Sequence, residues 1–238
     1  MNEGDVLYRP LVGILCDAMR LAELAEELDP IIKNPPDDYD YFIFARASIL
    51  NSAFLVECAI NSCIDQTDQS KRQRKLLQKA PVMKKYEILL PMLQPGQQLN
   101  PELELVKMVR ELIDVRNYYA HAKTASAKAE IIEESQNGGT FRMDPPQYPL
   151  TKIPTTLERC SHEDSINALR VATTFLSWYF CDLCKLEDIE LNQSLKSVLA
   201  LAAGYASLLE TPHRLLLNRL KSHFNLRLDF LPEFKSEA

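Results

Sequence analysis

Residues 111–124, ELIDVRNYYAHAKT, continue an amphipathic helix but place polar side chains where its apolar stripe should go on. The apolar positions that lead into the segment are spaced as on one face of a helix: they are Leu105, Val106, Val109, Leu112 and Ile113. The next step of this stripe is Arg116. Because burying an unpaired guanidinium is costly, we expect Arg116 to meet a carboxylate, a phosphate or another protein chain.

Asn117 and His121 lie four residues apart, on one face of the same predicted helix. Arg116 and His121 are five apart, which is about 140° around an ideal helix. Three arrangements stay open: the arginine curls round, the helix ends near His121, or two copies of the helix face each other. A structural role is the alternative, because a histidine and an arginine near a helix C-terminus also complement its dipole and its free carbonyls.

These three residue types suit one kind of chemistry. Histidine transfers protons near neutral pH, and arginine stabilises a negatively charged phosphoryl transition state. Asparagine can orient either the phosphate or the imidazole. Together, Arg116, Asn117 and His121 would suit cleavage of RNA by its own 2′-OH, which needs no metal ion.

A second predicted helix offers a partner for Arg116. In SILNSAFLVECAINSCID, residues 48–65, the stripe that starts with Leu50 and Phe54 turns polar at Glu57 and Asn61. A buried glutamate is rarely unpaired. We therefore expect Glu57 to orient Arg116 and Asn61 to complete the network; the alternative is that both polar residues only reach the edge of the domain.

The segment ELIDVRNYYAH resembles the signature of the HEPN superfamily, here Arg116-Asn117-x-x-x-His121. The upstream E-x-x-x-N of Glu57 and Asn61 resembles a helix of many prokaryotic HEPN-like proteins, and the likeness covers residues 39–122 and 165–184. The resemblance implies a helical bundle that dimerises into a composite cleft. Many members are metal-independent endoribonucleases of toxin–antitoxin, abortive-infection or other defence systems.

By this resemblance, His121 would be the general acid or base, Arg116 the phosphate-stabilising residue and Asn117 the positioning group. The expected partners are RNA, a second copy of the chain, and an antitoxin or defence protein. Two other readings stay open. Some family members have lost catalysis and serve as dimerisation or nucleic-acid-binding modules, and an antitoxin-type partner subunit is the third possibility.

Residues 70–85, SKRQRKLLQKAPVMKK, are rich in basic side chains and contain no acidic one. Six of these cations are predicted to follow an RNA backbone: they are Lys71, Arg72, Arg74, Lys75, Lys84 and Lys85. The alternative is a solvated helix face that offsets acidic residues elsewhere. The whole chain has a net charge of −6, so bulk positive charge does not draw it to nucleic acid.

Other features bear on cofactors and location. Cys181 and Cys184 form a CxxC, but one pair cannot supply four zinc ligands, so packed thiols are expected. No glycine-rich phosphate loop, HExxH or GxSxG occurs, and we expect no cofactor and no metal. The N-terminus is polar and the longest apolar run is short, which predicts a cytoplasmic protein without a membrane segment.

The chain is predicted to form one all-α, HEPN-like helical domain over residues 1–238, with its core at about 39–185. Helices are expected at 11–28, 39–65, in the basic segment, after Pro81 and from near Pro101. Residues 125–146 should hold a β-hairpin around Asn137-Gly138-Gly139. A further helix follows within 156–186, and the extension 186–238 is expected to add two or three helices from Asn192 to about Phe224.

Overall fold

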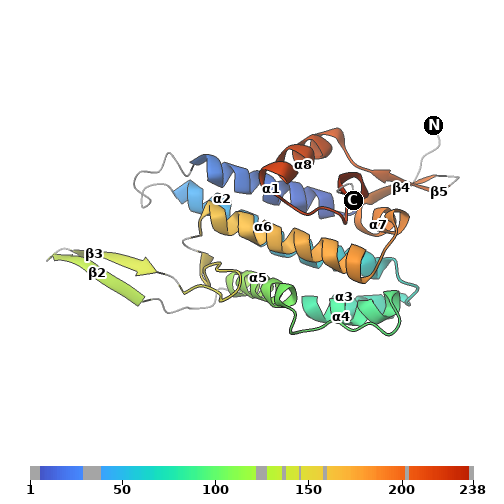
Figure 1. Ribbon diagram of the computed structural model, residues 1–238, viewed down its shortest axis with the longest axis horizontal. Helices are drawn as coiled ribbons and strands as arrows, with labels where there is room; N and C mark the ends of the chain where they lie inside the picture. The colour runs from blue at the N-terminus through green and yellow to red at the C-terminus, as the bar shows by residue number, and fades with distance from the viewer. Residues whose placement is uncertain are drawn as a thin grey trace.

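Three long helices form the body of the protein. The computed structural model describes residues 6–28, 39–121, 128–135, 138–144, 146–157, 160–201 and 204–235. Helices α1 (Leu11–Leu28), α2 (Tyr39–Asp65) and α6 (His162–Ser177) lie side by side along its longest axis (Figure 1). The predicted bounds of the first two helices are confirmed, and the all-α fold with a small hairpin is present.

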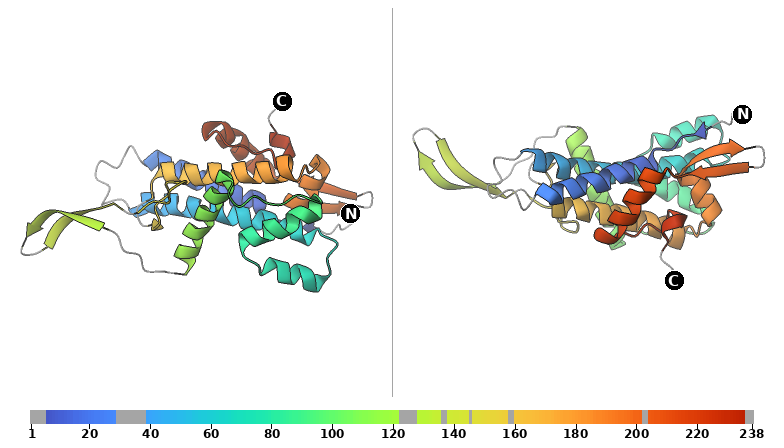
Figure 2. Two further views of the ribbon diagram at one scale, coloured as in Figure 1. Left: turned by 60° about the horizontal axis from the view of Figure 1, so that its bottom comes forward. Right: turned by 90° about the horizontal axis from the view of Figure 1, so that it is seen from above.

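Three further helices lie on one side of this body. They are α3 (Lys71–Gln78), α4 (Val82–Leu93) and α5 (Glu104–Ala120), and α5 runs across the long axis (Figure 2). The side chain of Ser70 caps α3, and α4 begins directly after Pro81. Because α5 packs on both α2 and α6, the end of α5 is brought beside the middle of α2.

A β-hairpin projects from one end of the body (Figure 1). Its strands β2 (Lys128–Ser135) and β3 (Gly138–Asp144) pair antiparallel, with Ser135 opposite Gly138. This confirms the hairpin predicted at residues 125–146. Asn137, which was expected in its turn, lies outside the described residues.

A second small sheet, which was not predicted, lies at the opposite end (Figure 1). Helices α7 (Asp188–Leu195) and α8 (Thr211–His223) form in the C-terminal region, but strands β4 (Ser197–Leu201) and β5 (Gly204–Leu208) lie between them. Strand β1 (Val6–Leu7) completes the order β1-β4-β5, with Val6 opposite Leu199. Two of the helices expected in this region are therefore present, but the strands between them were not predicted; β4 pairs with β5 and also with β1, which lies far away in the sequence.

A continuous hydrophobic core joins the helices. Its buried side chains come from α1, α2, α4, α5, α6 and α8. Tyr86 fixes α4 in place: its hydroxyl donates to the Val56 carbonyl oxygen at 2.7 Å, and its own carbonyl accepts from Tyr179 at 2.9 Å. Burial raises the pKa of Tyr86 well above its usual range. The residue that precedes Tyr86 is thereby held against α2.

The apolar character of α2 follows from its central place. Residues Phe42–Asp65 are long and apolar enough to cross a membrane by length and composition alone, with a mean hydropathy of 1.5. The short apolar runs in the sequence did not indicate that this helix is long and apolar enough to span a membrane. Half of it is buried inside the protein, as is usual for a core helix.

The CxxC lies at a π-helical turn, Trp178–Leu183, that continues α6. Cys181 and Cys184 are not joined to each other, and Cys184 is buried. Burial raises the pKa of Cys181 to about 11 and that of Cys184 to about 12. Within the described ranges, no three histidine, cysteine or acidic side chains are grouped as metal ligands would be.

Candidate functional site

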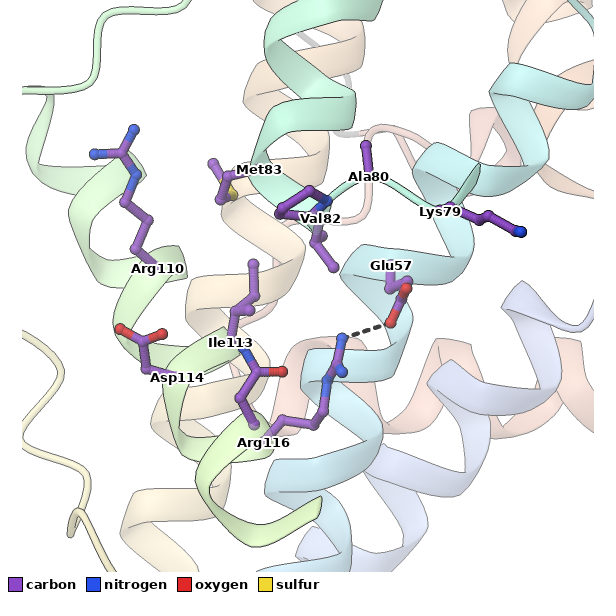
Figure 3. Close-up of a pocket in the computed structure, with 11 residues that line it drawn as sticks. Glu57, Lys79, Ala80, Val82, Met83, Arg110, Ile113, Asp114 and Arg116 are labelled. Atoms are coloured by element: carbon purple, nitrogen blue, oxygen red, sulfur yellow. Dashed lines mark hydrogen bonds and ion pairs between the residues drawn. The ribbon is translucent and has the colours of Figure 1, made fainter. Parts of the chain in front are cut away.

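The predicted contact between Arg116 and Glu57 is present. Arg116 on α5 points toward Glu57 on α2, and its Nη2 donates to Oε2 at 2.5 Å (Figure 3). The guanidinium carbon also lies 5.6 Å from the centre of the Phe54 ring, one helical turn before Glu57. The carboxylate and the ring therefore fix the direction in which the arginine extends.

A lysine that the sequence reading placed on the surface joins this pair. Lys85 Nζ donates to Glu57 Oε1 at 3.3 Å and to Asn61 Oδ1 at 2.9 Å. Lys85 is only 1% exposed. The prediction that Lys85 contacts an RNA backbone is therefore wrong, and Asn61 enters the network through Lys85.

The position of Lys85 could have been found from its helix. The buried positions of α4 repeat at three- and four-residue steps: they are Val82, Lys85, Tyr86, Leu89 and Leu90. Lys85 lies on this apolar stripe, as Arg116 does on α5. The charge of the basic segment hid this periodicity, so the lysine was assigned to the surface with its neighbours.

The four side chains form a cluster with excess positive charge. One carboxylate, Glu57, accepts from both Arg116 and Lys85. Arg116 is 16% exposed, and its Nε is buried without a hydrogen-bond partner in the described part of the chain. A partly dehydrated cluster of this kind favours a bound anion, because an anion would balance the second cation and accept further N–H bonds.

Arg116 and Asn117 line a cavity of about 440 Å³ at this cluster, here named the Arg116 cavity (Figure 3). Its polar lining is completed by Glu57, Lys79, Arg110 and Asp114. Arg110 also lies 3.5 Å from Glu87. Three cations against two carboxylates leave the walls positive, which is suitable for a phosphate group.

His121 lies apart from this cavity. Helix α5 ends at Ala120, and His121 is its C-terminal cap, with a backbone N–H that donates to the Asn117 carbonyl. The imidazole is exposed, and it is not among the described side chains that line the Arg116 cavity. Of the three arrangements considered, the helix indeed ends at His121, and one protomer does not bring His121 and Arg116 into one cavity.

The other predicted RNA contacts lie on the surface or near it. Lys71, Arg72 and Lys75 are exposed on α3, while Arg74 donates to the Asp65 carbonyl at 2.8 Å. Lys84 is exposed and pairs with Glu87 at 2.9 Å. These five side chains stay available to an anionic partner, in contrast to Lys85.

Comparison of the chain with protein-family models, curated proteins and solved structures found no match.

Proposed function

We propose that this protein is a metal-independent endoribonuclease of HEPN type that acts as a homodimer. The observation that carries the proposal is the shared carboxylate: Glu57 holds Arg116 and Lys85 together at a positively charged cavity that Asn117 also lines. Such a cavity is built to bind a phosphate.

In this proposal Arg116 stabilises the charge that develops on the phosphorus-bound oxygens, and Asn117 orients the phosphate. A histidine removes the proton of the 2′-OH while the O2′–P bond forms. The P–O5′ bond breaks, and the same histidine, now protonated, donates that proton to the leaving oxygen. The products are a 2′,3′-cyclic phosphate and a 5′-OH end.

A dimer is needed because His121 lies outside the cavity of its own protomer. The end of α5 is exposed at both Tyr119 and His121. If two copies place these ends together, the histidine of each one reaches the arginine of the other. The arrangement also explains why an exposed helix end carries a residue suited to proton transfer.

The biological role in this proposal is that of a cytoplasmic toxin or phage-defence nuclease, which the HEPN resemblance implies. An antitoxin or another defence protein would then be its regulator. The second candidate function is a non-catalytic dimerisation or nucleic-acid-binding module. The position of His121 outside the Arg116 cavity favours this candidate if the two copies do not bring the residues together.

The test is cleavage of a mixed RNA pool by purified wild type and His121→Ala, with EDTA present. We expect only the wild type to cleave, to leave 2′,3′-cyclic phosphate ends, and both proteins to elute as dimers. Absence of cleavage by the wild type, together with loss of the dimer in His121→Ala, would instead assign the module.

Mixing of subunits tests the composite site. A heterodimer of Arg116→Ala and His121→Ala protomers contains one site with both substitutions and one site with neither. We expect the mixture to regain cleavage that neither variant has alone. No recovery, with heterodimers demonstrated by differently tagged protomers, would place the arginine and the histidine of each site on one chain.

A further inference from the structure

A second cavity of about 410 Å³ adjoins the Arg116 cavity, and Glu57 lines both. Its walls are mainly apolar and come from the N-terminal residues 7–14 and from α2. Tyr8 and Phe54 supply aromatic rings, and Asn61 supplies a polar group. Tyr8 is 74% exposed, which leaves its ring accessible.

A third cavity of about 710 Å³ follows, and it shares Leu7 and Asp65 with the second. Lys71, Arg74 and Lys75 of α3 line it. Three cations against the one carboxylate of Asp65 make these walls strongly positive. The third cavity therefore has the same sign of charge as the Arg116 cavity, while the second contains more acid than base, with Glu57 and Asp65 beside Arg9.

The three cavities follow one face of α2. Glu57, Asn61 and Asp65 are four residues apart, so they form a row about 12 Å long on this helix. Glu57 stands between the first and second cavities, and Asp65 stands between the second and third. The order along the row is basic, aromatic and basic.

We propose that this row is the path of the single-stranded RNA substrate, with an unstacked base in the second cavity and phosphates in the two outer cavities. The inference rests on the proposed function and adds the route of the strand. Stacking on exposed aromatic rings together with backbone contacts to cations is how single strands are bound. The carboxylates of the second cavity would repel a phosphate but accept the amino or imino hydrogens of a base.

Arg9 gives independent support for a ligand in the second cavity. It is 6% exposed, and its Nη1 donates to the Lys196 carbonyl at 2.8 Å. Its Nη2 is buried and has no hydrogen-bond partner among the described residues. A carbonyl oxygen or ring nitrogen of a base would supply the missing acceptor.

The path is tested by fluorescence anisotropy with a fluorescein-labelled single-stranded RNA 12-mer and a duplex of the same length. All proteins carry His121→Ala, so that the probe stays intact. Tyr8→Ala removes the exposed ring, and Lys71→Ala/Lys75→Ala removes two cations of the third cavity. Lys107→Ala/Arg214→Ala is the matched control, because it removes two positive charges from α5 and α8 outside the three cavities.

We expect Tyr8→Ala to weaken single-strand binding by about fivefold or more. The Lys71→Ala/Lys75→Ala variant should lower the slope of log affinity against log salt by about 1.4, at ~0.7 per phosphate contact. The control should change neither quantity, and the duplex should bind more weakly than the single strand.

Unchanged affinity in Tyr8→Ala and an unchanged slope in Lys71→Ala/Lys75→Ala would overturn the path. If the wild type still cleaves RNA in that case, the ribonuclease stands and its strand runs elsewhere. If both variants lose binding while the wild type cleaves nothing, the path stands and the ribonuclease falls. Absence of any RNA binding would overturn the path and would indicate that a protein segment binds in these cavities instead.

Discussion

Two buried lysines of this protein are held in different ways. Lys196, at 0% exposure, donates to Glu233, and burial lowers the pKa of Lys196 despite this partner. Lys85, at 1% exposure, donates to Glu57, which also accepts from Arg116. The first arrangement is a charge-balanced pair; the second has two cations on one carboxylate and borders two cavities.

The difference separates a structural contact from a candidate binding site. The Lys196–Glu233 pair joins the residue after α7 to the C-terminal turn Pro232–Phe234, and its charges cancel. The Glu57 cluster keeps a surplus positive charge where an anion can enter. Burial of a second cation lowers stability unless a ligand completes the balance, so its presence is explained better by binding than by folding.

The largest expected effect comes from removal of the two carboxylates. Glu57→Gln should lower the free energy of unfolding by about 3 kcal/mol, because it leaves both Lys85 and Arg116 without their counter-charge. Glu233→Gln should lower the free energy of unfolding by about 1.5 kcal/mol. It leaves only Lys196 without a counter-charge, and a lysine can lose its proton. Urea unfolding followed by circular dichroism measures both. Equal losses would remove the distinction between the two clusters.

The pH dependence of these losses sharpens the comparison. Burial lowers the pKa of folded Lys196, so above that pKa the unfolded chain binds more protons and stability rises with pH toward 10.5. Glu233→Gln removes the partner that raises this pKa. The difference in stability between wild type and Glu233→Gln should therefore shrink as pH rises from 7 to 10.

The matching loss in Glu57→Gln should persist over that pH range, because arginine side chains stay charged in proteins. Unfolding curves at pH 7 and pH 10, each compared with the wild type at the same pH, give the two differences. A loss in Glu57→Gln that vanishes at pH 10 would contradict this expectation.

A smaller effect is expected when each lysine is replaced by methionine. Lys85→Met leaves Glu57 and Arg116 as a balanced pair and should weaken RNA binding about fivefold, or ~1 kcal/mol, through the lost charge. Lys196→Met is the control, and its RNA affinity should stay at the wild-type value. Anisotropy in the His121→Ala background measures both, and equal affinities for the two variants would contradict the assigned difference.

The smallest effect is expected at Lys84, the neighbour of Lys85 in sequence. Lys84 is 58% exposed and pairs with Glu87 on one helix face. Lys84→Ala should change the free energy of unfolding by no more than about 0.5 kcal/mol, as is usual for an exposed ion pair. Thermal or urea unfolding is sufficient, and a loss comparable to that of Glu57→Gln would show that exposure does not separate these lysines.

Local patterns predicted much of this fold. Residues 11–28 and 39–65 carry a helical period, the first ends before Pro30 and the second begins after Pro35-Pro36, so both helices could be delimited from the sequence. Strands β4 and β5 could not, because SVLALAAGYASL is rich in alanine and leucine and reads as helix. β4 pairs with β5 at five positions and with Val6–Leu7 at two, and the second contact joins segments far apart in the sequence.

The candidate site, like the fold, was only partly predictable from local sequence. The polar residues within the apolar stripes identified Arg116 and Glu57, and the structure places them in contact. Lys85 was assigned to the surface because of its charge, although its spacing along the helix indicated burial. The five-residue spacing, about 140° around the helix, separated His121 from Arg116, and the structure places His121 outside the Arg116 cavity.

We propose that the Glu57 cluster, unlike the Lys196–Glu233 pair, binds the phosphate of RNA. Cleavage of an RNA pool in EDTA by wild type, Arg116→Gln and Glu233→Gln tests it most directly. We expect Arg116→Gln to lose about 100-fold or more in rate while it stays folded, and Glu233→Gln to cleave as the wild type does. Cleavage by Arg116→Gln at the wild-type rate, or none by the wild type, would contradict the claim.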